Sequence, residues 1–254
     1  MTPQPEKIAL VTGAAKRIGR AIALELARQG WDVVVHYHRS ETDARTLVEE
    51  IATLGRRAIL LQCDLSDAAA VNGLLAHTTA FGRVSCLVNN AALFEHDTAD
   101  TLTAAGLDRH LQANLTAPLL LAQQLHALTP EGEQAVVINL LDQKLYNLNP
   151  DFLSYTLSKA ALHTATTLLA QALAPKLRVV GIAPGITMTS GDQTDAQFEQ
   201  AHRITPLGKS STPEDIAAAV CYVASARAIT GTTLLVDGGQ HLIPLQRDVM
   251  FLAK

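Results

Sequence analysis

The chain has 254 residues, a hydrophobic content of 48% and a formal net charge of −4. These values predict one α/β domain with a packed core and exclude a disordered chain. The acidic balance and the lack of any apolar run as long as a membrane span predict no nucleic-acid and no membrane partner.

Strand and helix patterns alternate almost to the end of the chain. In chain order, the predicted elements are a strand at 7–13, a helix at 17–30, a strand at 32–38, a helix at 41–55, a strand at 58–64, a short helix, a strand at 84–91, a helix at 107–128, a strand at 134–140, a helix at 152–173, a strand at 177–185, a helix at 213–224 and a strand at 232–239. Ser40 and Ser66 are expected to cap the helices after them, Pro118 to kink or break its helix, and Pro213 to occupy a first helical position.

This alternation predicts a single doubly wound parallel sheet of about seven strands, with helices on both faces, over residues 1–254. No linker or repeat divides the chain. Cys63, Cys86 and Cys221 are odd in number and widely spaced, and the N-terminus lacks a signal-peptide pattern, so we expect a cytoplasmic protein with reduced thiols.

The stretch "TGAAKRIGR" at 12–20 lies where the first strand turns into the first helix. Gly13 and Gly19 allow a tight turn and a close backbone approach to a pyrophosphate at the helix N-terminus. Arg17 and Ile18 lie between these glycines. An ordinary strand-to-helix turn is the alternative.

The second predicted strand ends in "HYHRS", which is His36, Tyr37, His38, Arg39 and Ser40, with no carboxylate before Glu41. Sites for NAD usually place an acid here, whereas arginine and serine suit a phosphate. The pattern therefore favours NADPH, and a solvated basic loop is the alternative. A metal site at His36 and His38 lacks a third ligand, so no metal is expected.

Two further turn residues fit an adenosine site. Asp64 follows the third strand and can accept a hydrogen bond from an adenine amino group. Asn89 ends the fourth strand and can line the ribose. Either residue alone is common in turns.

Tyr155 and Lys159 are four residues apart, which places both side chains on one face of the helix at 152–173. A nearby ammonium favours the phenolate, so we expect Lys159 to lower the pKa of Tyr155 and the pair to act in acid/base catalysis beside a hydride transfer. A helix-surface pair is the alternative.

Over nearly its whole length the sequence resembles the short-chain dehydrogenase/reductase family. The matching segments are residues 12–19, "NNA" at 89–91, Asn114, Tyr155 with Lys159, "PG" at 184–185 and "DGG" at 237–239. The resemblance implies hydride transfer with NADP(H), Tyr155 as the acid, Lys159 on the ribose and a relay water held by Asn114. It also implies cofactor contacts from Gly13, Arg17, Ile18, Gly19, His36, Tyr37, His38, Arg39, Ser40, Asp64, Leu65, Asn89, Ala91, Tyr155, Lys159, Pro184, Gly185 and Thr187.

Two departures from the family pattern occur together. Asp142 stands thirteen residues before Tyr155, where the family has serine, and Arg17 replaces the middle glycine of the loop. An ionised carboxylate cannot donate to a ketone, but it can accept from a ring amine or hold a protonating water. A loop cap is the alternative role for Asp142.

With these departures the sequence resembles the pteridine and dihydromonapterin reductases of the family. This resemblance implies a substrate site of Arg17, Phe94, Asp142 and Tyr155, in which Phe94 stacks a pterin. Loop packing is the alternative role for Phe94, and Ala92 lacks a hydroxyl that such reductases commonly have there.

The predicted function is NADPH-dependent reduction of a pterin-like heterocycle of dihydropteridine or dihydrofolate type. Reduction of another small carbonyl or imine compound and a non-catalytic dinucleotide sensor are the alternatives. We expect a substrate lid at 187–210, an apolar tail at 240–254 that contacts a neighbouring subunit's pocket, and a homotetramer by family resemblance.

Overall fold

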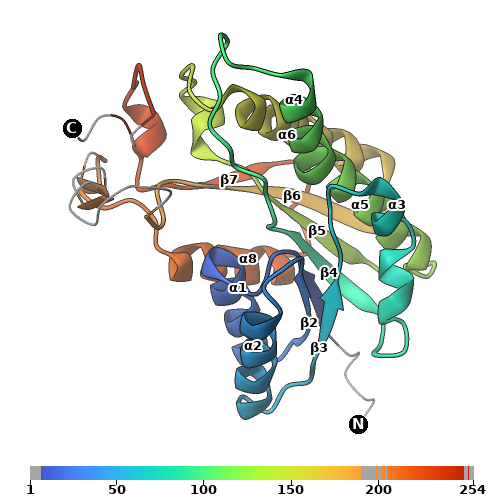
Figure 1. Cartoon of the computed structure of the whole chain (residues 1–254). Helices are drawn as coiled ribbons and strands as arrows, with labels where there is room; N and C mark the ends of the chain where they lie inside the picture. Colours follow the sequence, from blue (N-terminus) through green and yellow to red (C-terminus); the bar gives the residue numbers. More distant parts are fainter. Residues whose placement is uncertain (1–6, 190–197, 200–201, 204, 249–250, 252–254) are drawn as a thin grey trace.

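The computed structural model describes residues 7–189, 198–199, 202–203, 205–248 and 251. Its centre is one seven-stranded sheet in the order β3-β2-β1-β4-β5-β6-β7, and each neighbouring pair of strands is parallel (Figure 1). The strands are β1 (Ile8–Val11), β2 (Asp32–Tyr37), β3 (Ala58–Gln62), β4 (Val84–Asn89), β5 (Ala135–Leu140), β6 (Leu177–Pro184) and β7 (Thr233–Val236). The predicted fold class is confirmed.

Helices cover both faces of this sheet (Figure 1). One face carries α1 (Arg17–Arg28), α2 (Glu41–Thr53) and α8 (Pro213–Ser225). The other carries α3 (Ala68–Val71), α4 (Ala104–Leu111), α5 (Ala117–Leu128) and α6 (Leu153–Ala172). Successive strand residues enter opposite cores: Ala9 and Val11 pack in the first, and Ile8 and Leu10 in the second. This double burial is why the strands are continuous apolar runs.

The helix beginnings agree only partly with the predicted caps. Thr212 is the N-cap of α8 and forms a capping box with Asp215. Pro213 lies in the first turn of this helix, as predicted. Ser40 occupies the cap position of α2, but its side chain makes no capping hydrogen bond. The expected cap at Ser66 is wrong: Asp67 accepts from Ala69 N and Ala70 N at the start of α3, while the Ser66 hydroxyl donates to Asp64.

The expected break near Pro118 is confirmed. α4 ends at Leu111, one π-helical turn follows at Gln112–Thr116, and α5 resumes with Pro118 in its first turn. Proline lacks an N–H group, which a first turn does not need. Such wide turns are frequent at functional sites, and this one contains Asn114.

β1 lies between β2 and β4, so the chain changes direction across the sheet at this point. Crossovers leave β1 and β4 toward opposite faces and open a crevice beyond the carboxyl ends of the strands, where doubly wound folds bind ligands. None of the described helices is long and apolar enough to cross a membrane. Within the described ranges, His, Cys, Asp and Glu side chains form no group of three or more that could hold a metal ion.

Candidate active site

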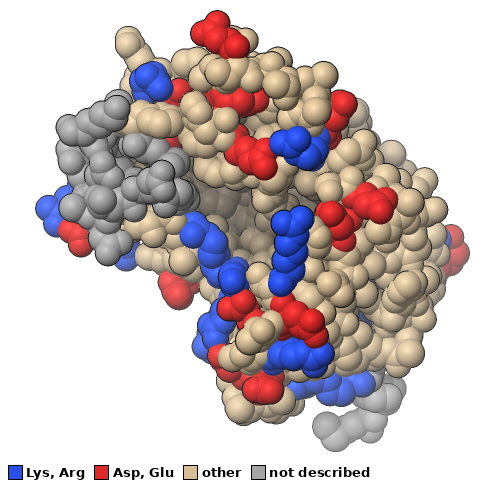
Figure 2. All heavy atoms as spheres, in the orientation of Figure 1, with Lys and Arg blue, Asp and Glu red and all other residues tan. Residues whose placement is uncertain are grey.

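Beyond the ends of β1, β2 and β3 lies a cavity of about 550 Å³. Its lining includes the following residues that were predicted to contact the cofactor: Tyr37, His38, Arg39, Ser40, Asp64, Leu65 and Ala91. Figure 2 shows the hollow on this face with basic side chains on its rim. Lys16, Arg39 and Arg109 supply positive charge to the cavity wall.

The loop between β1 and α1 is tightly folded. Gly13 has a φ of +62°, and a Cβ atom on it would lie 3.1 Å from Ala91 Cα. A Cβ atom on Gly19 would lie 2.3 Å from Gly13 O. Arg17 also has a positive φ, of 56°. The residue therefore has the backbone conformation of the glycine that the family pattern places there. Together with the basic rim, this turn at a helix N-terminus fits a dinucleotide phosphate.

His36 supports this loop from behind. Its side chain is 2% exposed, its Nδ1 accepts from Gly13 N at 3.0 Å, and its Nε2 lies 3.2 Å from Cys63 O. Those partners require a neutral ring with the proton on Nε2. Burial lowers the pKa of His36 to about 4. The neutral imidazole therefore joins the phosphate loop to the ends of β2 and β3.

A second cavity, of about 440 Å³, lies beyond β5 and β6 and shares Ala92 with the first. Its lining brings together Arg17, Ile18, Phe94, Asp142, Tyr155, Lys159, Pro184, Gly185 and Thr187. These residues come from five separate segments of the chain. The structure thus brings most of the predicted reacting residues to one wall.

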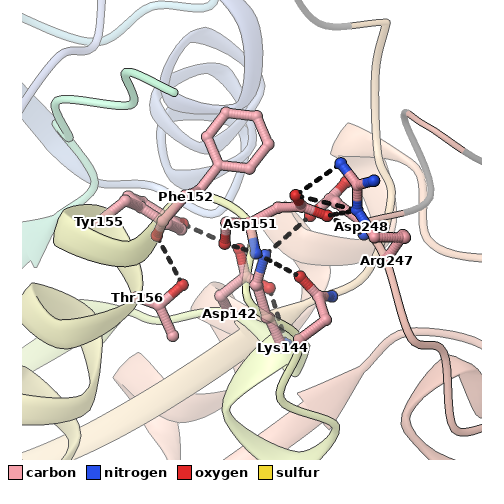
Figure 3. Close-up of polar contacts among 9 residues, drawn as sticks. Asp142, Lys144, Asp151, Phe152, Tyr155, Thr156, Arg247 and Asp248 are labelled. Atoms are coloured by element: carbon pink, nitrogen blue, oxygen red, sulfur yellow. Dashed lines mark hydrogen bonds and ion pairs between the residues drawn. The ribbon is translucent and has the colours of Figure 1, made fainter. Parts of the chain in front are cut away.

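Asp142 and Tyr155 form a partly buried pair in the lining of this cavity (Figure 3). The Tyr155 hydroxyl donates to Asp142 Oδ2 at 2.8 Å, and Lys144 N donates to Asp142 Oδ1 at 2.8 Å. Burial raises the pKa of Asp142. Burial and the adjacent carboxylate raise the pKa of Tyr155 well above its usual range.

The pKa of Tyr155 lies above its usual range although Lys159 was expected to lower it. Lys159 Nζ donates to Leu140 O at 2.6 Å and lies 5.8 Å from the centre of the Tyr155 ring. Burial lowers the pKa of Lys159 to about 8. Burial and the negative charge of Asp142 outweigh the distant ammonium, so the phenol stays protonated.

An aromatic wall flanks the Asp142–Tyr155 pair. Phe94 stacks on Phe152 with ring centroids 4.2 Å apart, and its ring meets Tyr155 edge-on at 4.7 Å. Phe94 is 42% exposed although it is a large apolar side chain. A flat ring in the cavity would cover this exposed face.

The C-terminal tail packs on the cavity of its own chain. Asp248 lines the cavity and pairs with the buried Lys144 at 3.1 Å, and Arg247 holds both carboxylate oxygens of Asp151 (Figure 3). No sequence motif points to Lys144 and Asp248, which are 104 residues apart. The tail was expected to contact a neighbouring subunit's pocket, and that expectation stays a prediction. Val249, Met250 and residues 252–254 of that tail lie outside the described residues.

Three predicted site residues lie behind the cavity walls. Asn89 is 3% exposed and donates to Asn139, its register partner on β5, whereas the next residue, Asn90, lines the cavity. Gly19 is buried in α1. Asn114 Oδ1 accepts from Leu93 N, and its Nδ2 donates to Leu93 O and to the Ser158 hydroxyl, so both N–H donors of the side chain are used within the protein.

The predicted lid at 187–210 is described only in part. Thr187 and Met188 line the cavity, and Thr189 O accepts from Arg17 Nη2 at 2.9 Å. Residues 190–197, 200–201 and 204 lie outside the described residues.

Residues 13–241 match the family model described as enoyl-(acyl carrier protein) reductase. An uncharacterized oxidoreductase of Methylorubrum extorquens is 38% identical and covers 92% of this chain and 97% of its own length. The 3-oxoacyl-[acyl-carrier-protein] reductase of Synechocystis sp. is 34% identical, with coverage of 94% and 98%. Among solved structures, FolM alternative dihydrofolate reductase 1 from Brucella canis, complexed with NADP, is 39% identical with a TM-score of 0.88, and the match covers 93% of this chain and 95% of that one.

Proposed function

Because the chain belongs to the short-chain dehydrogenase/reductase family, we propose that it is an NADPH-dependent reductase of a pterin-like heterocycle of dihydropteridine or dihydrofolate type. The observation that carries the substrate class is the partly buried hydrogen bond from the Tyr155 hydroxyl to Asp142 in a cavity that Arg17 and Phe94 also line. The likeness to a FolM structure complexed with NADP supports both the cofactor and the substrate class.

The residues of the first cavity fit the adenosine end of NADPH. Arg39 and Ser40 follow β2, where an NAD site would need a carboxylate, and they suit the additional phosphate. The turn at Gly13 and the start of α1 suit the pyrophosphate, with Arg17 at the boundary with the second cavity. Asp64, with its pKa lowered by hydrogen bonds from Ser66, is an ionised acceptor for an amino group.

The cavity favours a nitrogen heterocycle over a ketone for electrostatic reasons. Serine in this position would donate a hydrogen bond to a carbonyl oxygen, whereas Asp142 already accepts from Tyr155 and from Lys144 N. A heterocycle can present a ring nitrogen that needs a proton beside N–H groups that need acceptors. The Tyr155 hydroxyl can supply that proton, and the Asp142 carboxylate can accept from those N–H groups. The exposed face of Phe94 adds a stacking surface for a flat ring.

NADPH, when bound, supplies the hydride for the carbon of the ring C=N bond. Tyr155 holds the proton at its hydroxyl oxygen at neutral pH, because burial and Asp142 raise its pKa. Asp142 orients that hydroxyl, and Lys159, cationic below about pH 8, offsets the negative charge left when the proton moves to the ring nitrogen.

An NADPH oxidation assay with a dihydropterin, a dihydrofolate and a panel of ketones and 3-oxoacyl thioesters tests the proposal. We expect turnover with the pterin-type compounds and at least a hundredfold lower kcat/KM with the ketones. The Tyr155→Phe variant should lose more than a thousandfold in kcat, because it removes the proton donor but keeps the ring, and should bind NADPH as the wild type does. Full activity in Tyr155→Phe would refute its assigned role.

The second candidate function is reduction of a small ketone or an acyl thioester. The identity to a 3-oxoacyl-[acyl-carrier-protein] reductase favours it. A higher kcat/KM on a 3-oxoacyl thioester than on any pterin in the same assay would establish this function in place of the first. Tight NADPH binding with no turnover on the whole panel would instead support a dinucleotide sensor.

A further inference from the structure

Three phenylalanine rings from distant parts of the chain lie nearly parallel beside the substrate cavity. Phe94 stacks on Phe152 with ring centroids 4.2 Å apart and an interplanar angle of 14°. Phe251 of the C-terminal tail lies 6.1 Å from Phe152 at an angle of 23°. Phe94 lines the cavity and is 42% exposed, whereas Phe152 is 4% exposed. This phenylalanine row therefore connects the tail, through a buried ring, to an exposed ring of the cavity wall.

Phe152 has a backbone conformation that is rare for a phenylalanine. Its φ of 55° and ψ of 52° lie in the left-handed region, which is unfavourable for a residue with a Cβ atom. It is the N-cap residue of α6, and its carbonyl accepts from Thr156 N at 2.9 Å and from the Thr156 hydroxyl at 2.8 Å (Figure 3). Glycine would relieve this strain but would remove the ring that supports Phe94. Strain of this kind is concentrated at functional sites.

The tail segment that carries Phe251 is anchored at the start of α6. Arg247 Nε and Nη2 donate to the two carboxylate oxygens of Asp151, whose side chain is 2% exposed. Phe251 N donates to Asp248 O at 2.8 Å, and the Arg247 guanidinium lies 5.0 Å from the centre of the Phe251 ring. Because Asp151 directly precedes Phe152, these contacts hold the tail beside the buried ring (Figure 3).

Phe94 needs support from other segments because its own segment has no regular secondary structure. Residues 90–98, between β4 and α4, are neither helix nor strand. An exposed side chain in such a segment can adopt several rotamers, and a ligand that binds to one of them must pay for the loss of the others. Contact with the buried Phe152 ring restricts Phe94 before a ligand arrives. A ring that is already in place binds a flat ligand more tightly.

From these contacts we propose that Phe152 and Phe251 are positioning residues for substrate binding, through which the C-terminal tail fixes the Phe94 ring against which a flat heterocycle stacks. Phe152 acts on Phe94 directly, and Phe251 acts through Phe152. The affinity of the cavity for planar rings thus depends on a tail residue that is not among the described lining residues of the cavity. The inference rests on the proposed function, because it says how the same cavity holds its heterocycle.

A double-mutant cycle between Phe251 and Phe94 tests this coupling. The probe is an oxidised 2-amino-4-oxo-pteridine, titrated by calorimetry into the NADP⁺-loaded protein. In the wild-type background, Phe251→Ala should raise the dissociation constant about fivefold, because Phe94 is no longer fixed before binding. In the Phe94→Ala background the same replacement should change the constant by less than about twofold, since the ring on which Phe251 acts is absent. An equal factor in both backgrounds is expected from a general loss of structure and would overturn the inference.

Steady-state kinetics with NADPH and the corresponding dihydropteridine give a second readout. Phe251→Ala should raise the KM of the heterocycle about fivefold and leave kcat and the KM of NADPH near their wild-type values. Tyr222→Ala, which removes a 57% exposed aromatic side chain from α8, is the matched control and should leave all three values unchanged. A fall in kcat at unchanged KM in Phe251→Ala would contradict a role in positioning. If Phe251→Ala does not fold, Phe251→Leu, which keeps apolar volume without a flat ring, replaces it in both experiments.

The outcomes separate this inference from the proposed function. Reduction of pterins without coupling between Phe251 and Phe94 would overturn the inference and leave the function standing. Coupling between these residues in pterin binding, without reduction of any pterin, would support the inference and overturn the function. A wild type that neither binds nor reduces a pterin would overturn both.

Discussion

Arg17 combines a strained backbone with a side chain that lines the second cavity. Its φ of 56° lies in the left-handed region, which costs a side-chain-bearing residue about 1–2 kcal/mol. Its guanidinium lines the substrate cavity and donates to Thr189 O. Such strain persists where the side chain has a function and the surrounding structure holds it in place.

Replacing Arg17 by glycine should therefore separate stability from function. Relief of strain is offset by the larger backbone entropy of glycine in the unfolded chain, about 0.5–1 kcal/mol, and by the lost contacts of the side chain. We expect the unfolding free energy in urea to stay within about 1 kcal/mol of wild type, while the affinity for NADPH falls at least tenfold.

Arg39→Ala is the matched control for this change, because it removes an exposed arginine of the cofactor cavity from unstrained backbone. It should weaken NADPH binding much more than NADH binding. A loss of several kcal/mol of stability in Arg17→Gly would show that the arginine is needed for folding and would contradict our interpretation.

At the scale of the element, β2 shows how one strand position can control a neighbouring loop. His36 is the fifth residue of β2, and its ring accepts from Gly13 N in the turn after β1. The folded pKa of His36, about 4, lies below its ordinary value of 6.5. The stability that His36 contributes is therefore present above pH 6.5 and is lost as the pH falls toward 4.

This shift predicts a loss of about 2 kcal/mol of unfolding free energy from His36 between pH 7 and pH 5. His36→Asn keeps an acceptor near the position of Nδ1 but does not titrate, so the fall in stability between these pH values should be smaller by about that amount. Urea unfolding of both proteins at the two pH values measures it. Equal pH dependence in the two proteins would show that His36 is not held neutral.

The π-helical turn between α4 and α5 is the second element-scale feature. It allows Asn114 to hold the chain after β4 through Leu93 N and Leu93 O, and α6 through the Ser158 hydroxyl. These bonds place Phe94 next to Tyr155 across the cavity wall. Asn114 thus positions two segments of the site, and its predicted role with a relay water stays a prediction.

At the scale of the whole molecule, α6 presents an apolar outer face opposite its catalytic one. Leu157 and Leu168 are 46% and 59% exposed and are eleven residues apart, which places them on one side of the helix. Exposed apolar faces of this kind are typical of protein interfaces. We expect a second copy of the chain to cover this face in a homo-oligomer, a tetramer by family resemblance.

The double replacement of Leu157 and Leu168 by glutamate should lower the assembly state, because it introduces two charges into a buried apolar interface. Sedimentation velocity measures the change. Leu54→Glu is the control, since this exposed leucine follows α2 at another part of the surface. An unchanged sedimentation coefficient in the double variant would exclude this face as the interface.

The sequence by itself determined the parallel sheet, its flanking helices and the chain segments that carry the site. These follow from local signals: apolar runs for strands buried on both faces, helical periodicity, and glycines at the turn after β1. Since all parallel strands end at the same edge, motifs after strands converge there. Gly13, Arg39 and Asp64 were predicted in this way, whereas Tyr155 was predicted from its spacing to Lys159 and Asp142 from the family resemblance.

Only the tertiary structure decided how these residues act. Asn89 faces Asn139 because β4 and β5 pair in that register, so the cavity is lined by Asn90 instead. The pKa of Tyr155 rises because its side chain is buried and lies beside the Asp142 carboxylate. The approach of Asp248 to Lys144 depends on the path of the whole chain, since contacts between distant segments leave no periodic signal in a sequence.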